Sequence, residues 1–105
     1  MIPTRIYKSC PSKGIAYIDT MPYGHVYMIS DMIVPTVDRE QGIATGLMKR
    51  LFHLANENRH DLVIEPKPDN PAVFSRADFT RWLERLGFQK VNNQLWKRCH
   101  PVNKR

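Results

Sequence analysis

Alternating apolar and polar residues predict several short strands in the first third of the chain. Residues 4–8 and 15–19 each alternate in this way, and residues 21–24 read as a turn after the second of them. Residues 25–34 form a longer run that is apolar on both faces toward its end, and Pro35 stops it. We therefore expect three strands before residue 35, the third of them central in its sheet.

Two later segments have apolar residues at intervals of three or four, which predicts amphipathic helices. The first helix runs from Ala44 to about Asn58. The second follows Ser75, which forms a capping-box pattern with Asp78, and it ends before Gly87. Each helix should bury one face against the sheet.

Three more short strands complete the pattern. Residues 62–64 lie between the helices, and residues 88–91 and 94–97 flank Asn92 and Asn93 as a closing hairpin. The predicted order is β-β-β-α-β-α-β-β, an α/β fold with a mixed sheet. Because the first helix connects two strands as a crossover, the strands on either side of it should be parallel.

Length and charge limit the organisation of the chain. A chain of 105 residues forms one domain, which we assign to residues 1–98, followed by a basic tail at residues 99–105. From residue 76 onward there are eight Lys and Arg and two Asp and Glu, so this part carries the whole net charge of +6. This asymmetry fits an acidic or nucleic-acid-associated target, or simply a solvated basic surface.

The sequence favours a cytoplasmic protein that is not bound to a membrane. No apolar run approaches the roughly 18 residues of a membrane span, and the N-terminus lacks a secretory pattern. We therefore expect Cys10 and Cys99 to be reduced thiols. Cys99 and His100 lack the spacing and the partner pair of a zinc site, so we predict no metal.

A small-residue loop joins the third strand to the first helix. It reads Arg39-Glu40-Gln41-Gly42-Ile43-Ala44. Such a loop can direct several backbone N–H groups and the helix N-terminus at one bound anion. The loop therefore indicates a ligand that carries phosphate.

These residues and their setting resemble the GCN5-related N-acetyltransferase (GNAT) family. Arg39, Gly42 and Ala44 match its Q/R-x-x-G-x-G/A motif, Asn70 follows downstream, and the second helix ends in a Leu-Gly-Phe sequence around Gly87. The resemblance covers roughly residues 13 to 98 of the chain. It implies a GNAT-like acyltransferase fold, shortened at its N-terminus, and an enzyme that uses acetyl-coenzyme A as its co-substrate.

The resemblance also implies where the coenzyme binds. Backbone amides of the loop would hold the pyrophosphate, backbone groups of Ile33 and Val34 would pair with pantetheine, and Asn70 would contact it from the far side. The implied coenzyme-binding residues are Ile33, Val34, Arg39, Gln41, Gly42, Ile43, Ala44, Thr45, Gly46 and Asn70.

Catalytic groups are harder to assign. Many family members have a tyrosine as the general acid four residues before the glycine of Leu-Gly-Phe, and Leu83 stands there in this chain. Histone-type members also carry a base carboxylate early on the third strand, where this chain has apolar residues. The remaining candidates for catalysis are Asp31, Glu65, Tyr23 and His25.

The resemblance implies transfer of acetyl to a primary amine. Relatives carry a strand and two helices before this point, whereas about a dozen residues precede the second strand here. An open acceptor cleft follows, suited to a lysine or terminal amine of a protein. Three alternatives stay open: a small-molecule amine acetyltransferase acting as a homodimer, a non-catalytic coenzyme-binding or interaction module, and a basic nucleic-acid-binding protein.

Overall fold

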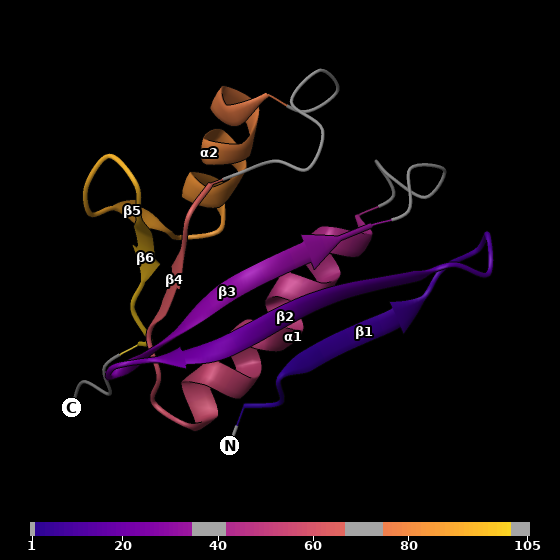
Figure 1. Cartoon of the computed structure of the whole chain (residues 1–105), viewed down its shortest axis with the longest axis horizontal. Helices are drawn as coiled ribbons and strands as arrows, with labels where there is room; N and C mark the ends of the chain where they lie inside the picture. The colour runs from indigo at the N-terminus through magenta and orange to yellow at the C-terminus, as the bar shows by residue number, and fades with distance from the viewer. Residues whose placement is uncertain (1, 35–41, 67–74, 102–105) are drawn as a thin grey trace.

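The computed structural model describes residues 2–34, 42–66 and 75–101. Figure 1 shows the arrangement of the elements. The strands are β1 (Arg5–Ser9), β2 (Ile15–Tyr23), β3 (Val26–Ile33), β4 (Leu62–Ile64), β5 (Gln89–Lys90) and β6 (Trp96–Arg98), and the helices are α1 (Ile43–Glu57) and α2 (Arg76–Arg85). The order of strands and helices along the chain is the predicted one.

All six strands belong to one mixed sheet, in the order β1-β2-β3-β4-β6-β5. Strands β1, β2 and β3 are antiparallel neighbours, and β6 pairs antiparallel with both β4 and β5. Strand β3 pairs parallel with β4, and α1 makes the connection between them. The predicted parallel pair on either side of the first helix is therefore confirmed.

The core lies on one face of this sheet. Both helices contribute to a single cluster of buried side chains, with Leu47 and Leu51 from α1 and Phe79 and Leu83 from α2. In Figure 1, α1 lies behind β1, β2 and β3, so the opposite face of these strands is turned toward the viewer. Among the described residues, no helix covers that opposite face.

A bulge interrupts the pairing between β2 and β3. Asp19 lies opposite Asp31 and Thr20 lies opposite Ile29, so Ser30 is an extra residue on β3. A bulge bends its strand and increases the local twist. This bend comes directly after Ile29, the last residue of β3 that pairs with β4.

The second strand is longer than predicted. Residues 21–24 were expected to form a turn, but β2 continues to Tyr23 and the turn consists of Gly24 and His25. Gly24 has φ of 64°, a conformation that glycine adopts without steric cost. The alternating exposure of residues 15–21 continues the strand pattern up to this glycine. The prediction of a turn at residues 21–24 was therefore wrong, since Pro22 pairs with Tyr27 inside the strand ladder.

The closing hairpin is formed by shorter strands than predicted. Its loop spans residues 91–95, where the Asn92 side chain accepts hydrogen bonds from the amides of Gln94 and Leu95 at 2.7 and 2.9 Å. An asparagine side chain that bonds to the backbone ahead of it stabilises such a turn. Ser75 caps α2 as predicted, since its side chain accepts a 3.1 Å hydrogen bond from the Asp78 amide.

Asp61 ties the start of β4 to the end of β6. Its Oδ1 accepts a 2.8 Å hydrogen bond from the His100 amide and lies 2.6 Å from His100 Nδ1, and its Oδ2 lies 3.4 Å from Lys97 Nζ. Burial acts to raise the pKa of Asp61, but hydrogen bonds from His100 and Lys97 outweigh it, so the pKa is lowered. The ionised carboxylate therefore stabilises the folded state.

We expect Asp61→Asn to lower the free energy of unfolding by about 1 kcal/mol at pH 7, a figure reduced for partial exposure. Because the folded-state pKa is lowered, this contribution is present above the ordinary pKa of about 3.9. It is lost as pH falls through the lower folded-state value. Urea unfolding of both proteins at pH 7 and pH 3 measures this contribution. If Asp61→Asn lowered the free energy of unfolding as much at pH 3 as at pH 7, the role of the charge would be contradicted.

Candidate functional site

Strands β3 and β4 diverge beyond the Ile29–Ile64 pair (Figure 1). Strand β4 ends at Ile64, whereas β3 continues to Ile33 and remains paired with β2 on its other edge. Within the described part of the chain, residues 30–33 therefore have no strand on the β4 side. A strand edge of this kind can accept an extended ligand by backbone hydrogen bonding.

The next element along the chain after β3 is α1, and its N-terminus is the second part of the candidate site. Gly42 is its N-cap residue, with no side-chain cap, and the first turn contains no acidic residue. The Gly46 amide donates a 2.9 Å hydrogen bond to the Gly42 carbonyl, which closes the first helical turn. The amides of residues 43–45 precede this bond and have no acceptor within the helix. They and the helix dipole can stabilise a bound anion.

This geometry refines the expected contributions of the two glycines. Gly46 was expected to offer its amide to the ligand, but that amide already bonds to Gly42. Gly42 has φ of 74°, and a Cβ built at Gly42 or at Gly46 would meet no atom within 4 Å. Glycine is therefore favoured at position 42 by its left-handed backbone, whereas at position 46 neither the backbone nor the surrounding space calls for glycine.

Thr45 joins the first turn of α1 to α2. The Trp82 Nε1–H donates a 3.0 Å hydrogen bond to Thr45 Oγ1. Leu83, beside Trp82, is fully buried in the core. In many members of the resembled family this position holds a tyrosine that acts as the general acid. Here it is part of the core packing.

A shallow open groove of about 400 Å³ begins at Gly46 and follows the polar face of α1. Lys49, Arg50, His53 and Leu54 line it together with Gly46. The Arg50 guanidinium donates a 3.2 Å hydrogen bond to the Tyr7 carbonyl, which holds it beside β1. The sequence analysis missed these basic residues, although their spacing one and two turns after the glycine loop was a usable signal.

Three of the expected coenzyme-binding residues, Arg39, Gln41 and Asn70, lie outside the described residues. The structure brings the others to two adjoining elements. Ile33 ends β3 and half-buried Val34 follows it, and residues 42–46 are the N-cap and first turn of α1. The Ile43 side chain is buried in the core and fixes the first turn against the sheet.

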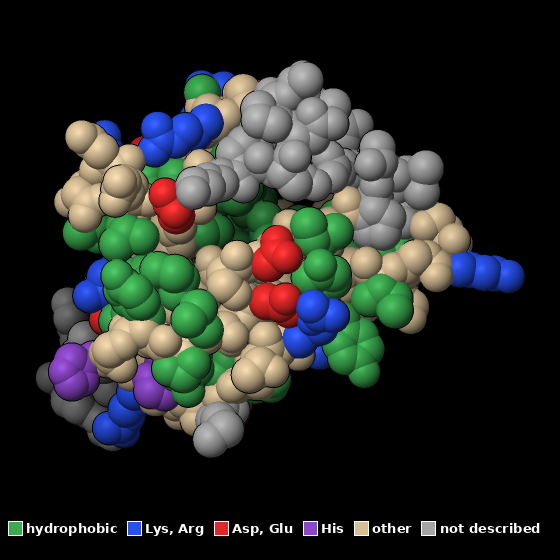
Figure 2. Space-filling view, in the orientation of Figure 1, with side chains coloured by type: hydrophobic (Ala, Val, Ile, Leu, Met, Phe, Trp, Pro, Cys, Tyr) green, Lys and Arg blue, Asp and Glu red, His purple; other side chains and the backbone are tan. Residues whose placement is uncertain are grey.

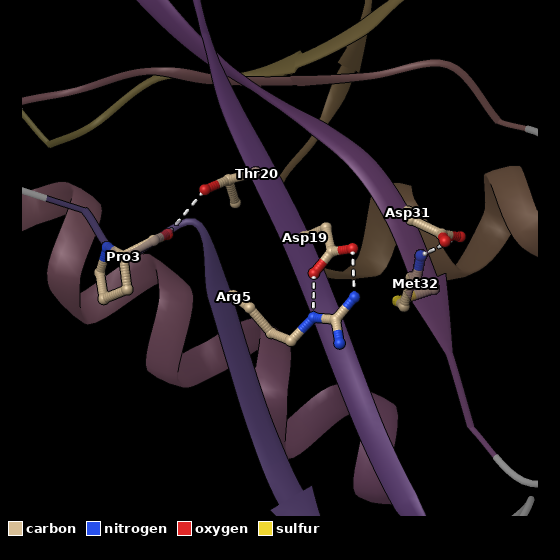
Figure 3. A network of polar contacts seen from close by, with 6 residues as sticks. All are labelled: Pro3, Arg5, Asp19, Thr20, Asp31 and Met32. Carbon is tan, nitrogen blue, oxygen red and sulfur yellow. Dashed lines mark hydrogen bonds and ion pairs between the residues drawn. The ribbon is translucent and has the colours of Figure 1, made fainter.

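Asp31 lies on the sheet face opposite α1, in line with Arg5 and Asp19 (Figure 3). Its Oδ1 accepts a 3.0 Å hydrogen bond from the Met32 amide. Arg5 binds Asp19 with both ends of its guanidinium, at 2.6 and 2.9 Å. This hydrogen bonding raises the pKa of Arg5, and the charge of Asp31 adds to the effect. The same hydrogen bonding lowers the pKa of Asp19.

The other catalytic candidates are far apart. Glu65 directly follows β4, where the two strands diverge, and it is exposed. Tyr23 and His25 are exposed at the β2–β3 hairpin, at the opposite end of β3 from Ile33. Val26 and Ile33 are seven residue steps apart, about 23 Å along an extended strand. Tyr23 and His25 therefore lie far along β3 from the strand edge at Ile33.

The described residues contain no group of three or more His, Cys, Asp or Glu placed to hold a metal ion. Neither described helix is long and apolar enough to cross a membrane. Cys10 is buried and Cys99 is exposed, and both are free thiols, as the sequence analysis expected.

No protein-family model matches this chain. No curated protein matches it either. Among solved structures, the chain is similar to the crystal structure of the anti-CRISPR protein AcrVA5, with a TM-score of 0.71 and 20% sequence identity. The alignment covers 89% of this chain and 94% of that chain. At this identity the likeness establishes a shared fold over nearly the whole of both chains.

We expect Gly42→Ala to lower the free energy of unfolding by about 1 kcal/mol, because alanine is strained at φ of 74°. Gly46→Ala is the matched control. It places the same methyl group in open space within a regular helix, and it should be neutral or stabilising by up to about 1 kcal/mol. Urea unfolding of both variants measures the difference, and equal stabilities would contradict the left-handed conformation at Gly42.

Proposed function

We propose that this protein is a compact GNAT-like N-acetyltransferase that transfers acetyl from acetyl-coenzyme A to a primary amine, preferably a lysine or terminal amine of a protein. One observation carries this proposal. Strands β3 and β4 diverge, and the next element along the chain after β3 is α1, whose N-terminus has no side-chain cap. This combination offers a strand edge for an extended ligand and a cluster of amides for an anion. Acetyl-coenzyme A has an extended pantetheine arm that suits the strand edge and a pyrophosphate that suits the amides.

The donor fits the described residues in the following way. Its pantetheine would lie along the β3 edge at Ile33 and Val34, and its pyrophosphate would accept hydrogen bonds from the amides of residues 43–45. Lys49 and Arg50 line the groove that begins at Gly46 and would attract further phosphate charge. The bulge at Ser30 supports this assignment, because the bulge bends β3 at the point where the pairing of β3 with β4 ends.

The coenzyme would supply an activated acetyl thioester, and the chain must remove a proton from the attacking amine. Glu65 is the better placed of the carboxylates, because it follows β4 at the divergence. Asp31 is the second candidate, on the exposed sheet face. The buried Leu83 cannot donate a proton to the leaving thiolate, so water would serve as the acid.

That buried leucine is also the observation that favours a second function, a non-catalytic module that binds the coenzyme without transferring acetyl. For the catalytic proposal, the fold shared with an anti-CRISPR protein suggests one class of acceptor to assay. An effector protein of a CRISPR system should be included among the protein acceptors.

We expect acetyl-coenzyme A to raise the melting temperature. At a concentration one hundred times the Kd, the stabilisation is about 2.7 kcal/mol, or roughly 10 °C or more for a domain of this size. Gly42→Glu should abolish the shift by placing a negative charge among the amides. Gly87→Glu is the matched control, because Gly87 also has positive φ, 101°, but lies at the end of α2. Both variants should melt lower without ligand, and only Gly87→Glu should keep the shift.

Transfer is tested by release of free thiol from acetyl-coenzyme A, with poly-L-lysine, a CRISPR effector protein and spermidine as separate acceptors. We expect release with a protein acceptor, and Glu65→Gln should lower its rate at least ten-fold while keeping the thermal shift. Release with spermidine alone would favour the small-molecule alternative. A thermal shift without thiol release from any acceptor would favour the non-catalytic module.

A further inference from the structure

The sheet face opposite α1 carries an unusual amount of apolar side chain. Along β2 the odd-numbered residues point to this face, and their partners on β1 and β3 point the same way. We call this surface the open face. Its members are Arg5, Tyr7, Ser9, Ile15, Tyr17, Asp19, Met21, Tyr23, Val26, Met28, Asp31 and Ile33.

Four of the five large hydrophobic side chains that are exposed in the described part of the chain lie on the open face. Tyr7 is 62% exposed, Ile15 55%, Tyr23 50% and Met21 47%. Figure 2 shows hydrophobic side chains across this face, with acidic and basic groups near its middle. Exposed apolar side chains gathered on one face are a feature of interaction sites.

The strand register makes the surface continuous. Tyr7, Tyr17 and Ile33 form one row across β1, β2 and β3, since each lies directly opposite the next. Met21 and Met28 form another row beyond the charged one. Side chains directly opposite in a sheet contact one another, so each row presents a connected apolar strip to a partner.

The charged row between them decides what kind of partner fits. Arg5 is bound by Asp19 and its guanidinium also lies 4.0 Å from the centre of the Tyr17 ring. Asp31 adds a second carboxylate to the same row, opposite Asp19. The row therefore carries one positive and two negative charges on a chain whose net charge is +6.

A partner that covers the open face must supply a cation. Removing Asp31 from water without a further positive charge would be unfavourable, because a buried carboxylate needs ionic partners. A second copy of the chain would bring another row of the same negative sign against the first. A nucleic acid would bring phosphates to it. Both are therefore poorer partners than a basic protein segment.

We propose that the open face docks a protein segment that pairs a Lys or Arg with Asp31 and covers the Tyr7–Tyr17–Ile33 row with apolar side chains. This inference goes beyond the proposed transfer activity, since the docking needs no coenzyme. Ile33 belongs both to this row and to the strand end at the donor site. A docked segment would therefore lie next to that site.

The test is NMR titration of the 15N-labelled protein, without coenzyme, with the peptide acetyl-Ser-Val-Lys-Val-Tyr-Ser-amide and a matched peptide with Glu in place of Lys. We expect the lysine peptide to shift amides of β1, β2 and β3 at millimolar concentrations and the glutamate peptide to shift none of them. Asp31→Asn should weaken binding at least three-fold. Glu84→Gln is the control, because it removes one exposed charge on α2 and should change nothing.

Several results would overturn the proposal. These are equal responses to both peptides, shifts confined to other surfaces, no response at millimolar peptide, or equal weakening by Asp31→Asn and Glu84→Gln. Sedimentation velocity of the protein alone provides a separate measure. Concentration-dependent dimerisation that is lost in Tyr7→Ser would assign the open face to a second copy instead. Because no coenzyme is present, these results are independent of whether acetyl-coenzyme A binds.

Discussion

The parallel pairing of β3 with β4 is the constraint on which the rest of the structure depends. It lasts for three residues on each strand and ends at Ile29 and Ile64. The α1 crossover requires the two strands to be parallel, and the bulge at Ser30 turns β3 away as soon as the pairing stops. One edge of β3 thus remains without a strand in the described part of the chain, and α1 begins at Gly42 a short segment further on. The candidate donor site is a consequence of where this pairing ends.

The fold followed from periodicity because each element obeys a strong local rule. The apolar spacing predicted α1, and Ser75 predicted the start of α2. The crossover connection predicted that β3 and β4 are parallel. The structure has all three features. The extent of β2 was missed because a proline can occupy a strand end beside a hairpin turn, and Gly24 then supplies the turn. Tyr23 and His25 lie at this hairpin, at the end of β3 away from Ile33.

Only part of the candidate site could be predicted from the sequence, and the reason is physical. Gly42 was identified from the small-residue loop and the motif match, whereas its positive φ is known only from the structure. The bond from Trp82 to Thr45 depends on how the two helices pack, which no local pattern specifies. Lys49 and Arg50, by contrast, could have been noted from their spacing after the glycine loop. The open face was equally hidden, because β2 carries apolar residues on both of its faces and its pattern does not show which face a helix covers. Donor site and open face meet at Ile33 on β3, so one strand would serve both proposals.

The most direct test of the donor-site claim is NMR titration of the 15N-labelled protein with coenzyme A. The account predicts that the largest changes in amide shift occur at residues 43–45 and at Ile33 and Val34, with little change at the Gly24 hairpin. Those residues line the strand edge and the helix N-terminus that the coenzyme would occupy. Changes that centre on another surface, or no change at coenzyme concentrations well above micromolar, would contradict it.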